Sequence, residues 1–307
     1  MLQPFGTTGV FVMLRRFRHG NYHTCCTRID IMPVWEYPPL RAQHLTNDTH
    51  NLFSMLRIGL LGCGNIGHII AQHRGSFAIT AVYDKVFEQA KGIATVSNAE
   101  AYEEFENFIS ADIDIVVEAA SIGAVKRFAG DVLSRKKDLV IMSVGALADP
   151  EFLEEIRMAA VKSGRKIYLP SGAIFGLDNL KIGRISPIDK LLLRATKSPQ
   201  SLGIDAKTDR KLLFCGKANE CIKAFPKNVN ISVAMSLAAG RDADVELWVD
   251  PTVDRNVHEL FIGGAFGETY IRITNVPSPD NPATSYLAAL SVLSLLDDLE
   301  NPIAVGT

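Results

Sequence analysis

Three glycines and one aspartate are spaced to hold a nucleotide. The segment Gly62-Cys63-Gly64-Asn65-Ile66-Gly67 has the pattern G-x-G-x-x-G, and Asp84 follows about 20 residues later. Gly62 permits a tight turn, Gly64 lets the backbone approach a pyrophosphate, and Gly67 lets a following helix pack closely on a strand. The spacing predicts a dinucleotide-binding turn, the alternative being a tight turn with no ligand.

A helix beginning at Asn65 would supply the charge complementarity of that site. The N–H groups of Asn65 and Ile66 and the positive end of the helix dipole favour phosphate oxygens. Asp84 is placed to accept hydrogen bonds from a ribose, and its charge should repel a 2′-phosphate. The residues therefore favour NAD, with NADP left possible, while FAD uses the same fingerprint and needs separate exclusion.

His258 is the candidate for proton transfer. Apart from His68 and His73, it is the only histidine after residue 54. Histidine titrates near neutral pH and suits proton transfer beside a hydride step. A packed histidine in a strand is the structural alternative.

Two asparagine-containing segments offer polar groups for a ligand. Asn228 and Asn230 precede a predicted helix and read equally well as helix caps. The segment 281–285 also reads as a helix start, but Asn281, Thr284 and Ser285 could instead donate to a substrate carboxylate.

Strands and helices alternate from residue 55 to about 170, which predicts a parallel sheet. The strand ends are rich in small residues, and we expect the loops 118–121, 143–147 and 171–178 to line a cofactor at the carboxyl edge. The expected strands are 56–61, 78–83, 113–118, 139–143 and 167–169, and the expected helices are 65–73, 123–135 and 150–163.

Strands at short spacing dominate after about residue 176. The fold class is therefore α/β, a Rossmann-type doubly wound parallel sheet with a second α+β domain whose sheet is mostly antiparallel. We expect a dinucleotide-binding domain at 55–176, a substrate domain at 177–282, and a terminal helix at 283–299 that packs on the first domain. The expected strands of the second domain are 190–196, 211–215, 245–249, 257–262 and 269–274, with a helix at 231–239.

Residues 1–54 differ from the rest, since they lack lysine and sustain no helical or strand period. We expect a disordered, dispensable extension or a mis-assigned start codon. The alternative is a targeting segment, suggested by Arg15, Arg16 and Arg18.

Composition narrows the class of protein. The chain has 307 residues, 47% of them apolar, and a formal net charge of −2, so neither nucleic acid nor a membrane is expected as a partner. The five cysteines form no CxxC pair and His258-Glu259 does not begin an HExxH motif, so no metal is expected. A cytoplasmic protein is the plain interpretation.

From Met55 onward the sequence resembles the L-aspartate dehydrogenase family. The segments that carry the resemblance are SVGAL at 143–147, SGAIFGLD at 171–178, FPKNVN at 225–230, NVHE at 256–259, FGE at 266–268, and NPATS at 281–285 followed by YLAAL.

The resemblance implies NAD(P)-dependent oxidative deamination of L-aspartate to iminoaspartate, which then gives oxaloacetate and ammonia or feeds NAD biosynthesis. It implies His258 as the active-site histidine, and Asn228 and Ala146 as contacts near the nicotinamide. His258 would either handle the proton on the substrate nitrogen or hold a substrate carboxylate as a cation. We also expect a homodimer.

Three positions depart from the family pattern. Ala283 stands where the family commonly has lysine, Thr196 where it often has arginine, and Lys217-Ala218 where it commonly has Ser-Ala. The alternatives are another two-domain oxidoreductase, resembling homoserine dehydrogenase or dihydrodipicolinate reductase, or a nucleotide-sensing protein without turnover.

Overall fold

The computed structural model describes residues 55–306 except 74, 205–208, 226–229 and 280, and it leaves the side chains of Pro282 and Ala283 undescribed. Residues 54–307 form one compact unit. The expectations for residues 1–54 and for Asn228 lie outside the described residues.

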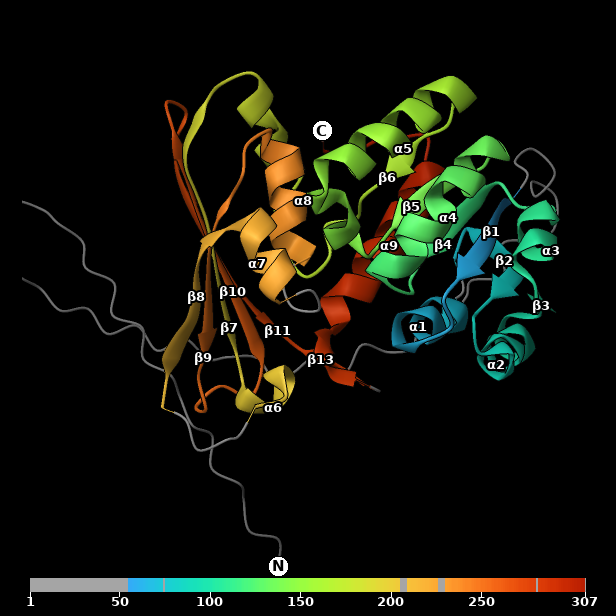
Figure 1. Ribbon diagram of the computed structural model, residues 1–307, viewed down its shortest axis with the longest axis horizontal. Helices are drawn as coiled ribbons and strands as arrows, with labels where there is room; N and C mark the ends of the chain where they lie inside the picture. The colour runs from blue at the N-terminus through green and yellow to red at the C-terminus, as the bar shows by residue number, and fades with distance from the viewer. Residues whose placement is uncertain (1–54, 74, 205–208, 226–229, 280, 307) are drawn as a thin grey trace, which may run out of the picture. The chain divides into compact units, whose positions relative to one another are not determined.

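A six-stranded parallel sheet forms the first half of this unit (Figure 1). Its strand order, β3-β2-β1-β4-β5-β6, reverses direction beside β1, as in a doubly wound fold. The central strands are mostly buried on both faces, which explains their largely apolar sequences. The strands are β1 (Leu56–Leu61), β2 (Phe77–Tyr83), β3 (Glu100–Tyr102), β4 (Ile115–Glu118), β5 (Asp138–Ile141) and β6 (Ile167–Tyr168).

The helices between these strands include three that the sequence analysis named. They are α1 (Asn65–Gln72), α4 (Ile122–Ser134) and α5 (Pro150–Ser163), each close to its expected range. The short strand β3 and its flanking helices α2 (Phe87–Ser97) and α3 (Phe105–Ser110) were not predicted. After β5 the chain forms a 3-10 helix, η1 (Val144–Ala148), and after β6 a second one, η2 (Asn179–Arg184).

A five-stranded sheet of order β11-β10-β7-β9-β8 forms the second half. The pair β7–β9 is parallel and the other three pairs are antiparallel, so the expectation of a mostly antiparallel sheet is confirmed. Helices α7 (Ala218–Ala224) and α8 (Asn230–Ala239) lie on one face of this sheet (Figure 1). Its strands are β7 (Ile188–Lys197), β8 (Lys211–Lys217), β9 (Asp244–Val249), β10 (Asn256–Gly264) and β11 (Gly267–Asn275), with a short helix α6 (Pro199–Leu202) between β7 and β8.

The C-terminal segment corrects one predicted boundary. Residues 283–285 belong to a strand, β13 (Asn281–Ser285), which pairs with β12 (Pro277–Ser278), and helix α9 covers Tyr286–Leu299. The Tyr286 N–H donates to the carbonyl of Val276 at 2.9 Å, so the helix begins where this hairpin closes. In the sequence, Asn-Pro followed by small polar residues resembles a helix start, but strand pairing uses the same residues.

Helix α9 packs on the parallel sheet. Val292, Leu293 and Leu296 share one hydrophobic cluster with Ile58 and Leu60 of β1. The chain therefore crosses to the second sheet and returns to the first. None of the described helices is long and apolar enough to cross a membrane.

Candidate active site

Two glycines of the turn after β1 are required by the protein's own packing. Gly62 has φ of +105°, and a Cβ there would lie 2.7 Å from the carbonyl carbon of Ala119. A Cβ on Gly67 would lie 2.5 Å from the carbonyl oxygen of Gly62. These two positions shape the turn and bring α1 against β1.

Gly64 differs, because a Cβ there would meet nothing within 4 Å. It is exposed, has an ordinary φ of −79°, and is the N-cap of α1, with no side chain capping the helix. The fold itself therefore gives no reason for glycine here. A pyrophosphate lying against the helix N-terminus would give one, so the residues fit a dinucleotide.

Asp84 sits at the carboxyl end of β2, beside this turn. One carboxylate oxygen accepts from the Cys63 N–H at 2.8 Å, and the other accepts from the Val86 N–H at 2.9 Å. These bonds fix the carboxylate beside the glycine turn, while the side chain stays partly exposed. Asp84 therefore supports the turn in addition to its expected contact with the ribose.

Asp84→Ser is expected to narrow the preference for NAD over NADP. Serine removes the charge that repels a 2′-phosphate, but it also leaves the Cys63 N–H without its acceptor. We therefore expect NAD to bind more weakly while NADP is affected less. Dissociation constants for both nucleotides, measured by calorimetry, test this, and an unchanged ratio would contradict the assignment.

Glu118 ties together the loops that follow β4 and β5. Its side chain is 2% exposed and accepts five hydrogen bonds. One oxygen accepts from the N–H groups of Ala120 and Ser121 and the hydroxyl of Ser143, and the other accepts from the N–H groups of Met142 and Ser143. Burial raises the pKa of Glu118, and the hydrogen bonds from Ser143, Ala120 and Ser121 act in the opposite direction. The sequence placed Glu118 in a cofactor-lining loop without indicating this role.

Glu118→Ala is expected to destabilise the fold strongly. It leaves the N–H groups of Ala120, Ser121 and Ser143 without their acceptor, while the Met142 N–H keeps the backbone carbonyl of Glu118. Each such group costs about 1–3 kcal/mol when water does not replace the partner. Because Ala120 and Ser121 are exposed, we expect a loss of about 2–3 kcal/mol in the free energy of unfolding, measured with urea, and weaker NAD binding. The exposed Glu103→Ala is the matched control, and equal stability of the two variants would exclude the role given to Glu118.

The loop after β5 reaches helix α8 rather than opening to solvent. The Gly145 N–H donates to Asn230 Oδ1 at 3.0 Å, so Asn230 joins the two halves and is more than a helix cap. Ala146 is fully buried in η1. Its contact with the nicotinamide stays a prediction.

His258 lies on β10 and is 3% exposed. Its Nδ1 is 3.2 Å from the carbonyl oxygen of Ala173 and 3.0 Å from Asn275 Nδ2. Asn275 Nδ2 also donates to the Ala173 carbonyl at 3.2 Å. Because Ala173 follows β6, these contacts bring His258 to the carboxyl edge of the parallel sheet.

Asn275 controls which nitrogen of His258 carries the proton. Both ring contacts involve Nδ1, so Nε2 is the nitrogen left for a substrate. A proton on Nδ1 is donated to the Ala173 carbonyl and leaves Nε2 as an acceptor. Donation from Asn275 Nδ2 to Nδ1 instead places the ring proton on Nε2, and turning the amide over removes this alternative. Within the described residues, Asn275 Oδ1 is buried without a hydrogen-bond partner. Nothing in the sequence pointed to Asn275, because its position near His258 depends on the pairing of β11 with β10, in which Asn275 lies opposite Asn256.

The environment of His258 keeps the ring neutral. Burial, reinforced by the positive charge of Lys197 and opposed by the Ala173 hydrogen bond, lowers its pKa to about 4. At pH 7 the free protein therefore has an uncharged imidazole at this position. A histidine that holds a carboxylate as a cation does not fit this environment, whereas proton acceptance or N–H donation does.

The three candidate substrate residues lie on one short hairpin beside the glycine turn. In this hairpin Asn281 pairs with Ser278, and Ser285 pairs with Pro277. Thr284, which precedes Ser285, is partly buried. The Ser278 hydroxyl is joined to the Asn65 side chain by contacts of 2.7 and 3.0 Å. The hairpin is therefore fixed to the N-terminus of α1, although no contact in the structure assigns these residues to a substrate.

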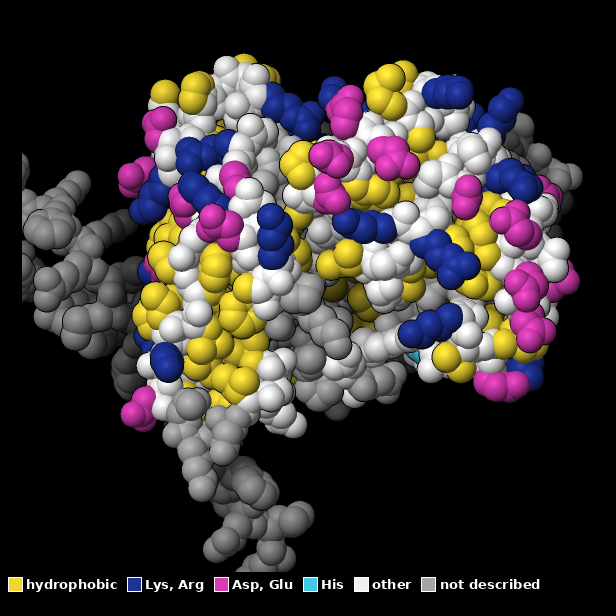
Figure 2. All heavy atoms as spheres, in the orientation of Figure 1, with side chains coloured by type: hydrophobic (Ala, Val, Ile, Leu, Met, Phe, Trp, Pro, Cys, Tyr) yellow, Lys and Arg dark blue, Asp and Glu magenta, His cyan; other side chains and the backbone are white. Residues whose placement is uncertain are grey.

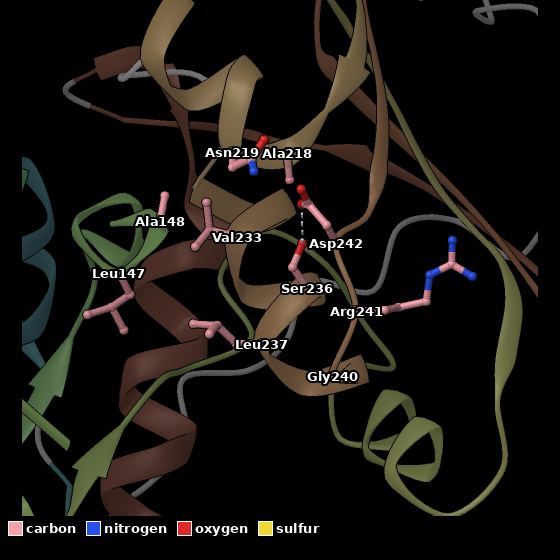
Figure 3. A pocket seen from close by; sticks show the side chains of 10 residues that line it. All are labelled: Leu147, Ala148, Ala218, Asn219, Val233, Ser236, Leu237, Gly240, Arg241 and Asp242. Carbon is pink, nitrogen blue, oxygen red and sulfur yellow. Dashed lines mark hydrogen bonds between the residues drawn. The ribbon is translucent and has the colours of Figure 1, made fainter. Parts of the chain in front are cut away.

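A hollow of about 370 Å³ lies elsewhere, between η1, α7 and α8 (Figure 3). Leu147, Val233 and Leu237 give it an apolar lining, Asp242 bonds to Ser236, and Arg241 extends away from the others. Its lining contains none of the glycine turn, Asp84 or His258, so it is separate from the candidate site.

Comparison with protein families matches both halves of the chain. Residues 178–299 match the family described as aspartate dehydrogenase, C-terminal. Residues 59–170 match the family described as homoserine dehydrogenase, NAD binding domain.

Individual proteins give the same picture. An L-aspartate dehydrogenase of Methanospirillum hungatei is 56% identical over 253 residues, covering 82% of this chain and all of the relative. One of Methanocaldococcus jannaschii is 41% identical over 267 residues, with the same coverage. The crystal structure of an aspartate dehydrogenase from Thermotoga maritima aligns with a TM-score of 0.71 at 30% identity, covering 83% of this chain and all of that one.

Proposed function

The chain belongs to the L-aspartate dehydrogenase family, and we infer that it oxidises L-aspartate with NAD, removing hydride from Cα to give iminoaspartate. Residues 55–176 would hold NAD, and residues 177–282 would supply His258 and the substrate contacts. The observation that carries this assignment is the neutral His258 fixed to Ala173 at the carboxyl edge of the parallel sheet.

Different residues would bind different parts of NAD. The Gly64 turn and the first N–H groups of α1, from Asn65 and Ile66, would receive the pyrophosphate, and Asp84 would receive the adenosine ribose. When bound, NAD supplies the hydride acceptor. Glu118 holds the two loops between these positions and Ala173.

His258 would manage the proton on the substrate nitrogen. The amino group of aspartate must lose a proton before Cα can release hydride. A neutral imidazole whose Nδ1–H donates to the Ala173 carbonyl would be able to accept this proton at Nε2. Carboxylates bound nearby would raise the pKa of His258 from about 4, because an opposite charge favours imidazolium. Substrate binding would thus strengthen the base that the reaction needs.

An assay of NADH formation tests the function. L-aspartate should be oxidised well above D-aspartate, glutamate, alanine and homoserine, with iminoaspartate trapped as oxaloacetate and ammonia. Oxidation of homoserine in preference to aspartate would favour the other family whose model matches residues 59–170. Tight NAD binding without turnover of any of these acids would favour a sensing role.

We further propose a cytoplasmic homodimer that pairs through the open face of the five-stranded sheet. Among the described helices, α7 and α8 cover the other face of this sheet (Figure 1). Hydrophobic side chains gather over its strands (Figure 2), and Leu212 and Tyr270 are 39% and 53% exposed. Light scattering of the full chain measures the mass directly, and a monomer at micromolar concentration would contradict the proposal.

A further inference from the structure

We propose that Ser278 is a positioning residue that couples the binding of NAD to the binding of the substrate. The proposal rests on the function above, and it adds a role that neither the sequence motifs nor the comparisons with known proteins assign to this serine. It is carried by the contact between Asn65 of the glycine turn and Ser278 of β12.

The Asn65 side chain is bonded to Ser278 rather than to its own helix. Asn65 is the first residue of α1, directly after the N-cap Gly64, and no side chain caps this helix. Its Nδ2 donates to the Ser278 hydroxyl at 2.7 Å, and that hydroxyl donates to its Oδ1 at 3.0 Å. One hydroxyl therefore contacts both polar atoms of the amide, which fixes the orientation of the Asn65 side chain.

The position of β12 depends on contacts of this kind. Ser278 is only 2% exposed, although β12 has just two residues. An isolated two-stranded hairpin such as β12–β13 is marginally stable at best, so the rest of the chain must hold it in place. The bonds to Asn65, a residue 213 positions earlier in the sequence, provide such a connection.

The chain on either side of Ser278 leads to the groups proposed for the substrate. Three residues earlier, about 10 Å along extended backbone, Asn275 contacts Nδ1 of His258 at 3.0 Å. On the other side, Ser278 pairs with Asn281 of β13, the strand that carries the three candidate substrate residues. Ser278 therefore connects the glycine turn to both sets of groups.

Both ligands would stabilise this one contact. A pyrophosphate at the N–H groups of Asn65 and Ile66 would hold the first turn of α1 and, with it, the Asn65 amide that bonds to Ser278. A ligand that orders residues needed by a second ligand lowers the entropic cost of the second binding step, which gives positive cooperativity. By linkage, the substrate must raise the affinity for the nucleotide by the same factor.

Contact between the nicotinamide and the substrate would also give cooperativity, and ADP-ribose separates the two causes. ADP-ribose retains the adenosine, the pyrophosphate and the second ribose of NAD but lacks the nicotinamide. It would occupy the glycine turn without accepting hydride, so L-aspartate itself can serve as the second ligand without turnover. A gain in L-aspartate affinity with ADP-ribose cannot come from contact with the nicotinamide ring.

The test measures the dissociation constant of L-aspartate by calorimetry in the full chain, with and without saturating ADP-ribose. The ratio of the two constants is the coupling factor. Wild type is compared with Ser278→Ala, Asn65→Ala and the double variant. Ser163→Ala is the matched control, because Ser163 is a half-buried serine of α5 whose hydroxyl donates to the Ala159 carbonyl.

Wild type should bind L-aspartate at least about 5-fold more tightly with ADP-ribose, the lower end of typical couplings between sites. Ser278→Ala and Asn65→Ala should each lower this factor below about 2, since each removes the same contact. The double variant should lose no further coupling, and Ser163→Ala should keep the wild-type factor. A purely structural role for Ser278 would lower Tm without changing the ratio.

Each outcome decides one proposal, because NADH formation from L-aspartate is measured on the same preparations. If wild type oxidises L-aspartate but ADP-ribose does not raise its affinity, or if Ser278→Ala keeps the wild-type factor, the role of Ser278 is wrong and the function stands. Should Ser278→Ala fail to fold, Asn65→Ala decides by the same criterion. A wild-type chain that neither oxidises nor binds L-aspartate would overturn both.

Discussion

A Gly64→Val variant is expected to fold normally and to lose NAD binding. The valine side chain would enter open space, since a Cβ at Gly64 meets no protein atom within 4 Å, and φ of −79° is accessible to valine. The same space is where a pyrophosphate must approach the backbone. We expect the dissociation constant for NAD to rise at least about 100-fold, which is about 2.8 kcal/mol, with an unchanged Tm in the absence of nucleotide.

Gly92→Val provides the matched control. Gly92 is an exposed residue of α2, and a Cβ there also meets nothing within 4 Å. It should leave both Tm and NAD affinity near wild type. Gly62→Ala should behave oppositely to Gly64→Val and lose stability, because its Cβ would meet the backbone of Ala119 and Ala120 at 2.7 Å. Wild-type NAD affinity in Gly64→Val would place the cofactor elsewhere.

The glycine turn was predictable because its chemistry is local. Strand, turn, helix and acid follow one another within 29 residues from Leu56 to Asp84, and each glycine has its own steric reason. The broad fold was predictable for a similar reason, since the strands of both sheets have clear apolar periods. Strand β3 was not predicted, because its three exposed or half-buried residues are too few to show such a period.

The residues around His258 were harder to predict from the sequence, because their positions depend on strand register. Asn275 reaches the ring only because β10 and β11 pair so that Ile273 faces His258, and a slip of one residue would turn Asn275 to the other face. Lys197 lay just beyond the predicted strand, where a lysine ordinarily suggests an exposed end. Its burial is set by packing between segments far apart in the chain.

The role of Glu118 was also hard to predict, because two of its hydrogen-bond partners lie far from it in the sequence. A glutamate at the end of an apolar strand was visible in the sequence, as was the small-residue loop that follows it. Its partners Met142 and Ser143 directly follow the next strand of the sheet, β5, and only the folded sheet brings these N–H groups to one carboxylate.

Replacing His258 by alanine is expected to lower kcat for L-aspartate by roughly 10²–10⁴-fold, the usual contribution of a general acid–base group. The affinity for NAD should change little, because the glycine turn and Asp84 are untouched. Steady-state kinetics with both substrates varied, together with calorimetry for NAD, measure the two effects separately. His73→Ala is the control, because His73 is an exposed histidine outside the site whose Nε2 lies 3.8 Å from the Asp297 carboxylate.

The pH dependence of stability gives a second readout that does not depend on turnover. The folded-state pKa of His258 is about 4, below its ordinary 6.5, so between these values the unfolded chain binds the proton more readily. Wild type should therefore lose stability as pH falls from 6.5 toward 4, and His258→Ala should lose less over the same window. If His258→Ala loses less stability than wild type between pH 6.5 and 4 but keeps the wild-type kcat/KM, His258 is a buried structural residue. A rise in KM alone would make it a substrate-binding group, because only a fall in kcat indicates an interaction made in the transition state.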